Sequence, residues 1–178
     1  MKKLLFVLLA VLVLLFVQGC FLLFVCVEFE GLTVGTEYHY GDTFSEGTTK
    51  MELIGFYWSG ATTPTTNGHM TVDGQGLAGG SGNDVNLNNI SLSFDFCCNP
   101  SGLTLKFGEY GGNINLKING QLENKEDFFV LNGSTVAGVS VTVTDLGGGK
   151  GTLKLDGKIT SFAIGGQELW IDSICPTR

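Results

Sequence analysis

Proline and histidine are scarce in this chain of 178 residues, and so are charged side chains. There are three prolines and two histidines, and charged residues make up 15% of the sequence. His39 and His69 stand in no recognisable nucleophile motif, and the chain has no Gly-x-Ser-x-Gly elbow. Nucleophilic catalysis therefore has little support, and we expect a protein that is not an enzyme.

Basic residues are also few. The chain has ten Lys and Arg against 17 Asp and Glu, for a formal net charge of −7 at pH 7. Proteins that bind nucleic acid or anionic lipid headgroups present basic patches instead. The charge balance argues against nucleic acid as a partner, and it suits solubility outside the cell or a cation ligand.

Helical periodicity is missing after Cys26, and period-two alternation takes its place. The stretch Asp84–Phe96 is the clearest case and predicts a long strand, with apolar residues at 90, 92, 94 and 96 separated by polar ones. Similar runs follow at 103–107, 114–118 and 139–143, with glycine pairs between runs. The spacing predicts an all-β fold of about ten to twelve short strands in a sandwich or barrel.

Residues 1–19 have the pattern of a signal peptide. Two lysines precede an apolar run that extends from Leu4 to Val17. The run ends in Val17-Gln18-Gly19-Cys20, which resembles the bacterial lipobox. That resemblance implies a lipid anchor on Cys20 and a membrane attachment through it.

The rest of the chain, residues 20–178, is expected to form one β-sandwich domain that is secreted or held in the cell envelope. Two other interpretations of the start stay open. The segment could direct simple secretion, or Leu4–Val27 could remain as an uncleaved anchor helix, because it is long enough to span a bilayer.

Five cysteines occur, and setting Cys20 aside leaves an even number. Outside the cytoplasm this favours disulfides. Because the first and last strands of a sandwich are often neighbours, Cys26 and Cys175 are the expected pair. Cys97 and Cys98 are adjacent and cannot bridge easily. A metal site is their alternative, although the spacing matches no zinc pattern.

Several sequence segments together resemble those of known proteins. The segments 26–30, 35–44, 76–82, 107–113 and 164–172 resemble bacterial secreted or lipoprotein-type proteins of uncharacterised function. The ending Glu168-Leu-Trp-Ile-Asp172 is similar to the closing strand of jelly-roll carbohydrate-binding modules. The resemblance implies a jelly-roll-like antiparallel β-sandwich, preceded by the signal or anchor helix.

The same resemblance implies a structural Ca²⁺ where the first and last strands meet. Its ligands would be Glu28 and Glu30 with Asp172, because calcium prefers carboxylate and carbonyl oxygens. A second oxygen-rich cluster lies at the junction of a loop and a strand, although turn and capping chemistry also explains such a cluster. It consists of Asn83, Asp84, Asn86 and Asn88.

A carbohydrate ligand needs an exposed aromatic ring beside polar groups. Tyr110 is the best candidate, because it lies in a glycine-rich loop with Glu109 and Asn113. We therefore expect a non-catalytic binding module for an extracellular glycan. The alternatives are a structural or adhesive surface lipoprotein, and a glycan hydrolase that pairs Glu109 with Asp42, Asp127 or Glu168.

Overall fold

The computed structural model describes residues 24–178, which form fourteen strands and one short 3₁₀ helix, η1 (Phe128–Leu131). The expected signal segment, the anchor helix and Cys20 lie outside the described residues. Within residues 24–178, no helix has the length and apolar content needed to cross a bilayer.

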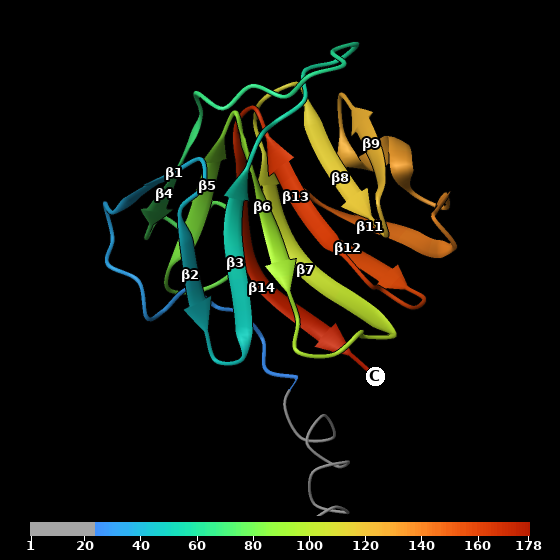
Figure 1. Ribbon diagram of the computed structural model, residues 1–178, viewed down its shortest axis with the longest axis horizontal. Coiled ribbons are helices and arrows are strands. Elements are labelled where there is room, and N and C mark those ends of the chain that lie inside the picture. The colour runs from blue at the N-terminus through green and yellow to red at the C-terminus, as the bar shows by residue number, and fades with distance from the viewer. Residues whose placement is uncertain (1–23) are drawn as a thin grey trace, which may run out of the picture.

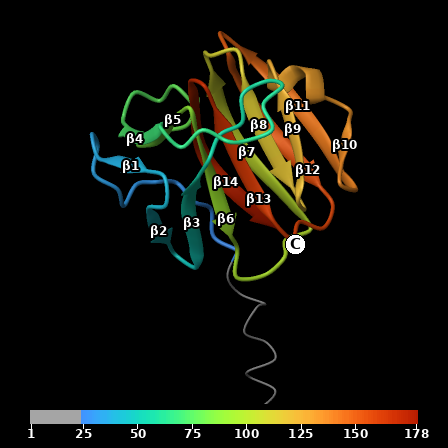
Figure 2. The ribbon, with the colours of Figure 1, turned by 45° about the horizontal axis from the view of Figure 1, so that its top comes forward.

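The strands form two antiparallel sheets that pack face to face (Figures 1 and 2). The eight-stranded sheet has the order β1 (Glu37–His39), β4 (His69–Asp73), β5 (Asp84–Asn88), β14 (Leu169–Thr177), β7 (Gly102–Glu109), β12 (Lys150–Asp156), β11 (Val139–Gly147) and β10 (Thr135–Val136). The six-stranded sheet has the order β2 (Thr43–Glu46), β3 (Thr49–Ile54), β6 (Ile90–Asp95), β13 (Phe162–Gly166), β8 (Ile114–Ile118) and β9 (Gln121–Lys125).

The chain crosses repeatedly from one sheet to the other. Strands β5, β6, β7 and β8 alternate between the two sheets, and so do β12, β13 and β14. Such alternation is typical of jelly-roll sandwiches. The expected all-β sandwich is confirmed. The strand number exceeds the expectation because β1, β2 and β10 have only two to four residues each, too few for an alternating pattern to show.

The core lies between the two sheets and is formed by the apolar residues that alternate with polar ones along each strand. Leu92 and Phe94 of β6 and Leu105 and Phe107 of β7 belong to one core cluster, and all four are at most 3% exposed. Burying one such side chain contributes about 1.5–3 kcal/mol. The polar residues between them are left on the two outer faces, meaning the faces turned away from the core.

The alternating pattern predicts one long strand over Asp84–Phe96, but the structure has two strands there. The stretch divides at Asn89 into β5, in the larger sheet, and β6, in the smaller one. Asn89 has a φ of 55°, a left-handed conformation that asparagine tolerates better than most residues. Its backbone N–H donates to Gly166 at 2.9 Å. The core positions shift phase at the same point, from 85 and 87 to 90, 92 and 94.

The hairpin between β8 and β9 follows directly from its turn sequence. Asn119 and Gly120 have φ values of 50° and 85°, as a two-residue hairpin of type I′ requires. Ile118 then pairs with Gln121 across the turn. This hairpin forms the edge of the six-stranded sheet that lies opposite β2.

Candidate functional site

The outer face of the six-stranded sheet carries a groove over β2, β3 and β6, with a volume of about 420 Å³. Met51 of β3 points into the core, so its neighbours Lys50 and Glu52 point outward. The same alternation turns Ser93 and Asp95 of β6 into the groove. Its lining is thus largely hydroxyl, carboxylate and ammonium groups.

The groove continues across the sheet because the two central strands carry small outward residues. Ala163 and Gly165 of β13 lie opposite Ser93 and Ser91 of β6. A second hollow of about 200 Å³ is lined by Ser93, Ala163 and Lys117 among others. Since Ser93 lines both hollows, they form one track. We call the surface of Lys50, Glu52, Ser93, Asp95, Lys117 and Ala163 the polar track.

The polar track is close to neutral, because its two lysines balance its two carboxylates. Lys50 and Asp95 are register partners on β3 and β6, yet no ion pair within 4.0 Å joins them in residues 24–178. Their charged groups are therefore open to a ligand. Such a surface suits an uncharged, hydroxyl-rich ligand better than a polyanion.

The two ends of the polar track differ. Phe44 of β2 borders the larger hollow, but it is the register partner of the core residue Met51 and packs against the core, with its ring centroid 4.8 Å from that of Tyr38. At the far end Tyr57 lines a small hollow with Leu122 and Lys117. Aromatic rings can stack on the apolar face of a sugar while polar groups bond its hydroxyls.

Asn113, one of the three expected ligand-binding residues, is buried and holds the backbone of Tyr57. Its Nδ2 donates to the Tyr57 carbonyl at 3.2 Å, and its Oδ1 accepts from Ser59 N at 3.0 Å. Asn115 bonds both the N–H and the carbonyl of Tyr57, and Asn124 donates to that carbonyl as well. These amides fix the loop that bounds the polar track.

The other two expected ligand-binding residues point to opposite faces of the larger sheet. Tyr110 is 42% exposed, as its loop predicted, and lies on the outer face. Its ring contacts Trp170 at 5.3 Å between centroids, and its hydroxyl donates to the Leu77 carbonyl at 3.1 Å. Glu109 points instead toward η1. The structure does not bring Glu109, Tyr110 and Asn113 to one surface.

Glu109 acts on η1. Its Oε2 accepts from Phe128 N at 3.1 Å, while Asp127 accepts from Phe129 N at the start of the same helix. Burial raises the pKa of Glu109 to about 7, and the nearby Asp127 adds to the rise against the lowering effect of the Phe128 bond. Glu109 and Asp127, one of the pairs considered for a hydrolase, therefore both accept hydrogen bonds from backbone N–H groups of η1.

The outer face of the larger sheet carries a buried carboxylate pair, Asp84 and Asp172. In the antiparallel register of β5 and β14, Asn86 pairs with Trp170 and Val85 with Ile171. One further step places Asp84 opposite Asp172. Each is 1% exposed. Burial raises the pKa of both carboxyls, to about 6 for Asp172.

A glycine-rich loop, residues 74–83, covers this carboxylate pair. Ala78 N donates to Oδ2 of Asp84 at 3.0 Å, and Lys150 Nζ donates to the Gly76 carbonyl at 3.0 Å. A Cβ on Gly80 would lie 1.6 Å from Oδ2 of Asp172, and one on Gly108 would lie 2.1 Å from the Leu77 carbonyl. The loop backbone therefore rests directly on the sheet, where a larger side chain has no room.

The expected calcium ligands lie around the start of the described chain without forming one compact set. Oε2 of Glu28 accepts from Ser173 Oγ at 2.8 Å, and its charge helps to raise the pKa of Asp172. Glu30 is exposed, and its Oε1 accepts from Asn83 N at 3.2 Å. Glu28 is thus electrostatically coupled to Asp172, while Glu30 anchors the end of the glycine-rich loop.

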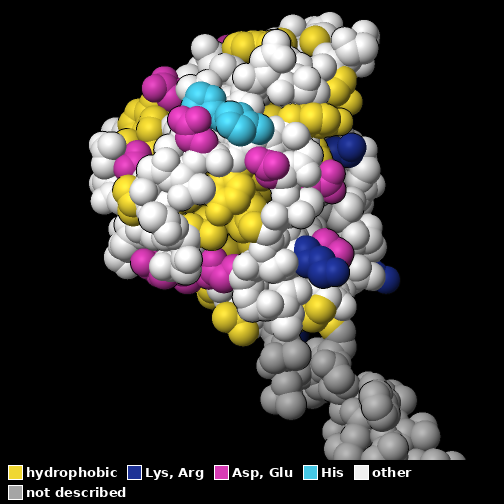
Figure 3. Space-filling view, turned by 60° about the vertical axis from the view of Figure 1, so that its left-hand side comes forward, with side chains coloured by type: hydrophobic (Ala, Val, Ile, Leu, Met, Phe, Trp, Pro, Cys, Tyr) yellow, Lys and Arg dark blue, Asp and Glu magenta, His cyan; other side chains and the backbone are white. Residues whose placement is uncertain are grey.

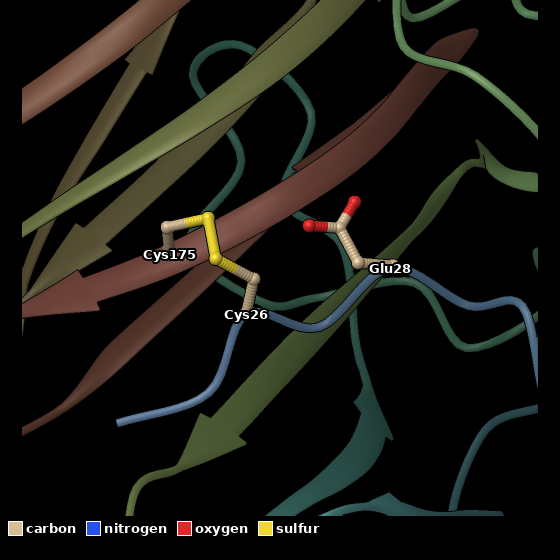
Figure 4. A group of neighbouring side chains, drawn as sticks. All are labelled: Cys26, Glu28 and Cys175. Carbon is tan, nitrogen blue, oxygen red and sulfur yellow. A yellow bond between two sulfur atoms is a disulfide. The ribbon is translucent and has the colours of Figure 1, made fainter. Parts of the chain in front are cut away.

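The expected Cys26–Cys175 disulfide is confirmed (Figure 4). In residues 24–178, the one set of three metal-ligating side chains within 4.8 Å consists of these two cysteines and Glu28. Both sulfurs are consumed by the disulfide, so this set is not a metal site. Cys97 and Cys98 have sulfur atoms 3.7 Å apart at the end of β6.

The two histidines lie together at the edge formed by β1 and β4. His39 and His69 are register partners with ring centroids 6.4 Å apart, and acidic side chains surround them (Figure 3). Glu37 lies 4.0 Å from His39. His39 is exposed and His69 is half-buried.

Sequence reasoning missed the polar track. A signal was present, because the outward positions of β6 and β13 hold Ser91, Ser93, Ala163 and Gly165. Small residues on one face of central strands predict a hollow only once those strands are known to be neighbours. Their pairing joins segments about seventy residues apart, and alternation does not encode it.

The fold and this surface define an antiparallel β-sandwich with a polar, nearly neutral track on one outer face. A scan against protein-family models, a search of curated proteins and a search of solved structures each found no match for this chain. The function must therefore be argued from the geometry.

Proposed function

We propose that this protein is a non-catalytic binding module that acts outside the cytoplasm and holds a glycan along the polar track. The observation that carries the proposal is the track itself, a hollow of about 420 Å³ with hydroxyl, carboxylate and ammonium groups, continued by a second of about 200 Å³. The residues that line it come from five neighbouring strands, which at a spacing of about 4.8 Å extend roughly 19 Å. This is room for several sugar rings.

Charge and location support the same proposal. The balance of Lys50 and Lys117 against Glu52 and Asp95 disfavours nucleic acid and other polyanions, in keeping with the acidic net charge. A disulfide between Cys26 and Cys175 is typical of proteins outside the cytoplasm. Lipid attachment through Cys20 would hold the module at the membrane surface.

The first test is binding of the full chain to a glycan array and to insoluble polysaccharides, with affinity measured by calorimetry. The decisive variant is Ser93→Trp, which fills the track at the residue that both hollows share. Affinity is expected to fall at least about tenfold, a loss of about 1.4 kcal/mol. Glu52→Gln, which keeps the shape and removes a charge, should weaken binding less.

Ser140→Trp is the matched control, because Ser140 is exposed on the other sheet, on β11. It introduces the same ring far from the track and should bind as the unmodified protein does. If the folded protein binds no glycan, or if Ser93→Trp binds as tightly as Ser140→Trp, the polar track is not a glycan site.

A further inference from the structure

The carboxylate pair on the other outer face contains an oxygen atom that no protein group satisfies. Oδ2 of Asp84 accepts from Ala78 N, but Oδ1 is buried and has no hydrogen-bond partner in residues 24–178. Oδ1 of Asp172 accepts from Ser173 N at 2.6 Å. A buried carboxylate oxygen without a partner is costly, so such groups normally bind a cation or a proton.

The charges around the pair sum to a negative value. Glu28 is coupled to Asp172, and Asp73 is coupled to Asp84. The positive side chain beside these carboxylates is that of Lys106, the register partner of Asp172 on β7. One lysine against several carboxylates leaves an excess of negative charge in a place that water scarcely reaches.

The glycine-rich loop covers this place. Ala78 N donates to Asp84, Gly80 lies against Asp172, and Tyr110 and Lys150 tie the loop down through the Leu77 and Gly76 carbonyls. Backbone carbonyl oxygens, which such a loop can supply, are ligands that hard cations accept. Soft metals are disfavoured, because the cluster offers oxygen rather than sulfur or imidazole.

We propose that Asp84 and Asp172, enclosed by residues 74–83, form a binding site for a divalent cation of the Ca²⁺ type. The cation takes the free Oδ1 of Asp84 together with the carboxylate of Asp172 and fastens the loop to the outer face of the larger sheet. This set shares Asp172 with the expected set and has Asp84 of β5 in place of Glu28 and Glu30.

The test is a calorimetric titration of the EDTA-treated full chain with CaCl₂, joined to melting curves at increasing calcium concentration. One Ca²⁺ per chain and a melting temperature that rises with calcium are expected. Tb³⁺ gives a second readout. Trp170 donates through Nε1 to Asp73 at 3.1 Å, close enough to the site to sensitise Tb³⁺ luminescence.

Asp84→Asn and Asp172→Asn keep the side-chain shape and remove the charge, so each should lower calcium affinity at least tenfold and quench the Tb³⁺ signal. Asp156→Asn, which changes an exposed acid at the end of β12, should alter neither readout. The proposal is overturned if the unmodified protein shows no binding heat and no rise in melting temperature with CaCl₂ up to about 10 mM. That concentration is about ten times the dissociation constant of the weakest extracellular calcium-binding modules. Retention of full calcium affinity in either Asn variant overturns it too.

Discussion

At the scale of single residues, the packing of the glycine-rich loop on the larger sheet requires glycines at the closest contacts, because a Cβ would clash there. Gly80 rests on the Asp172 carboxylate, and Gly108 lies under the Leu77 carbonyl. Neither needs a left-handed backbone, so what these positions require is space. The glycine-rich loop is therefore a packed layer over the sheet.

Replacing Gly80 by alanine tests this packing. The new methyl group would lie 1.6 Å from Oδ2 of Asp172, so the loop must lift or the carboxylate must move. We expect Gly80→Ala to lower the free energy of unfolding by about 1–3 kcal/mol, as overpacking does. Urea unfolding would measure the loss. Gly112→Ala is the control, because nothing lies within 4 Å of its Cβ position, and equal stability losses in both variants would contradict the packing argument.

Individual residue roles were only partly predictable from the sequence. The exposure of Tyr110 followed from its glycine-rich surroundings. The burial of Asn113 did not, because its partner Tyr57 lies more than fifty residues away in the chain. Asp84 and Asp172 each stood out as oxygen-rich positions, but their meeting depends on the pairing of β5 with β14.

At the scale of elements, the alternating pattern located the long central strands and failed at short or interrupted ones. It predicted β7, β8 and β11 well, because each places at least three apolar residues in the core. It merged β5 and β6, because a single residue, Asn89, carries the change of sheet. It also missed η1, which begins where Asp127 caps the backbone.

The element η1 gives a pH prediction through Glu109. Burial raises the pKa of this carboxyl from 4.5 to about 7 in the folded chain, so folding favours the neutral form. Its stabilising contribution is full below pH 4.5 and is lost as pH rises toward 7. Glu109→Gln keeps an acceptor for Phe128 N and removes the charge. We expect it to gain about 1–2 kcal/mol over the unmodified protein between pH 5 and pH 8, after discounting for solvent screening.

Urea unfolding at several pH values measures this gain. Glu168→Gln, a substitution at an exposed position, serves as the control and should track the unmodified protein across the range. Parallel stability curves for Glu109→Gln and the unmodified protein would show that Glu109 does not favour its neutral form on folding.

At the scale of the whole molecule, the two outer faces differ in what covers them. The face of the six-stranded sheet is hollowed around Ser93, where the polar track lies, while the loop at Tyr57 covers its neighbour Asn115. The face of the larger sheet is closed at β5, β14 and β7 by the glycine-rich loop. The proposed glycan site and the proposed cation site therefore lie on different faces, so the two proposals can fail independently.

The disulfide joins the two ends of the sandwich and supplies the last prediction. Cys26 and Cys175 are separated by 149 residues, beside the bridge between Val27 and Ile174. A loop of this length lowers the entropy of the unfolded chain by the equivalent of up to about 5 kcal/mol. The double variant Cys26→Ala with Cys175→Ala should lose much of that stability in guanidinium unfolding. Its m value should rise, because the unfolded chain without the link exposes more surface. A circular dichroism spectrum equal to that of the unmodified protein would confirm that the sandwich persists, and an unchanged midpoint would show that the disulfide does not stabilise it.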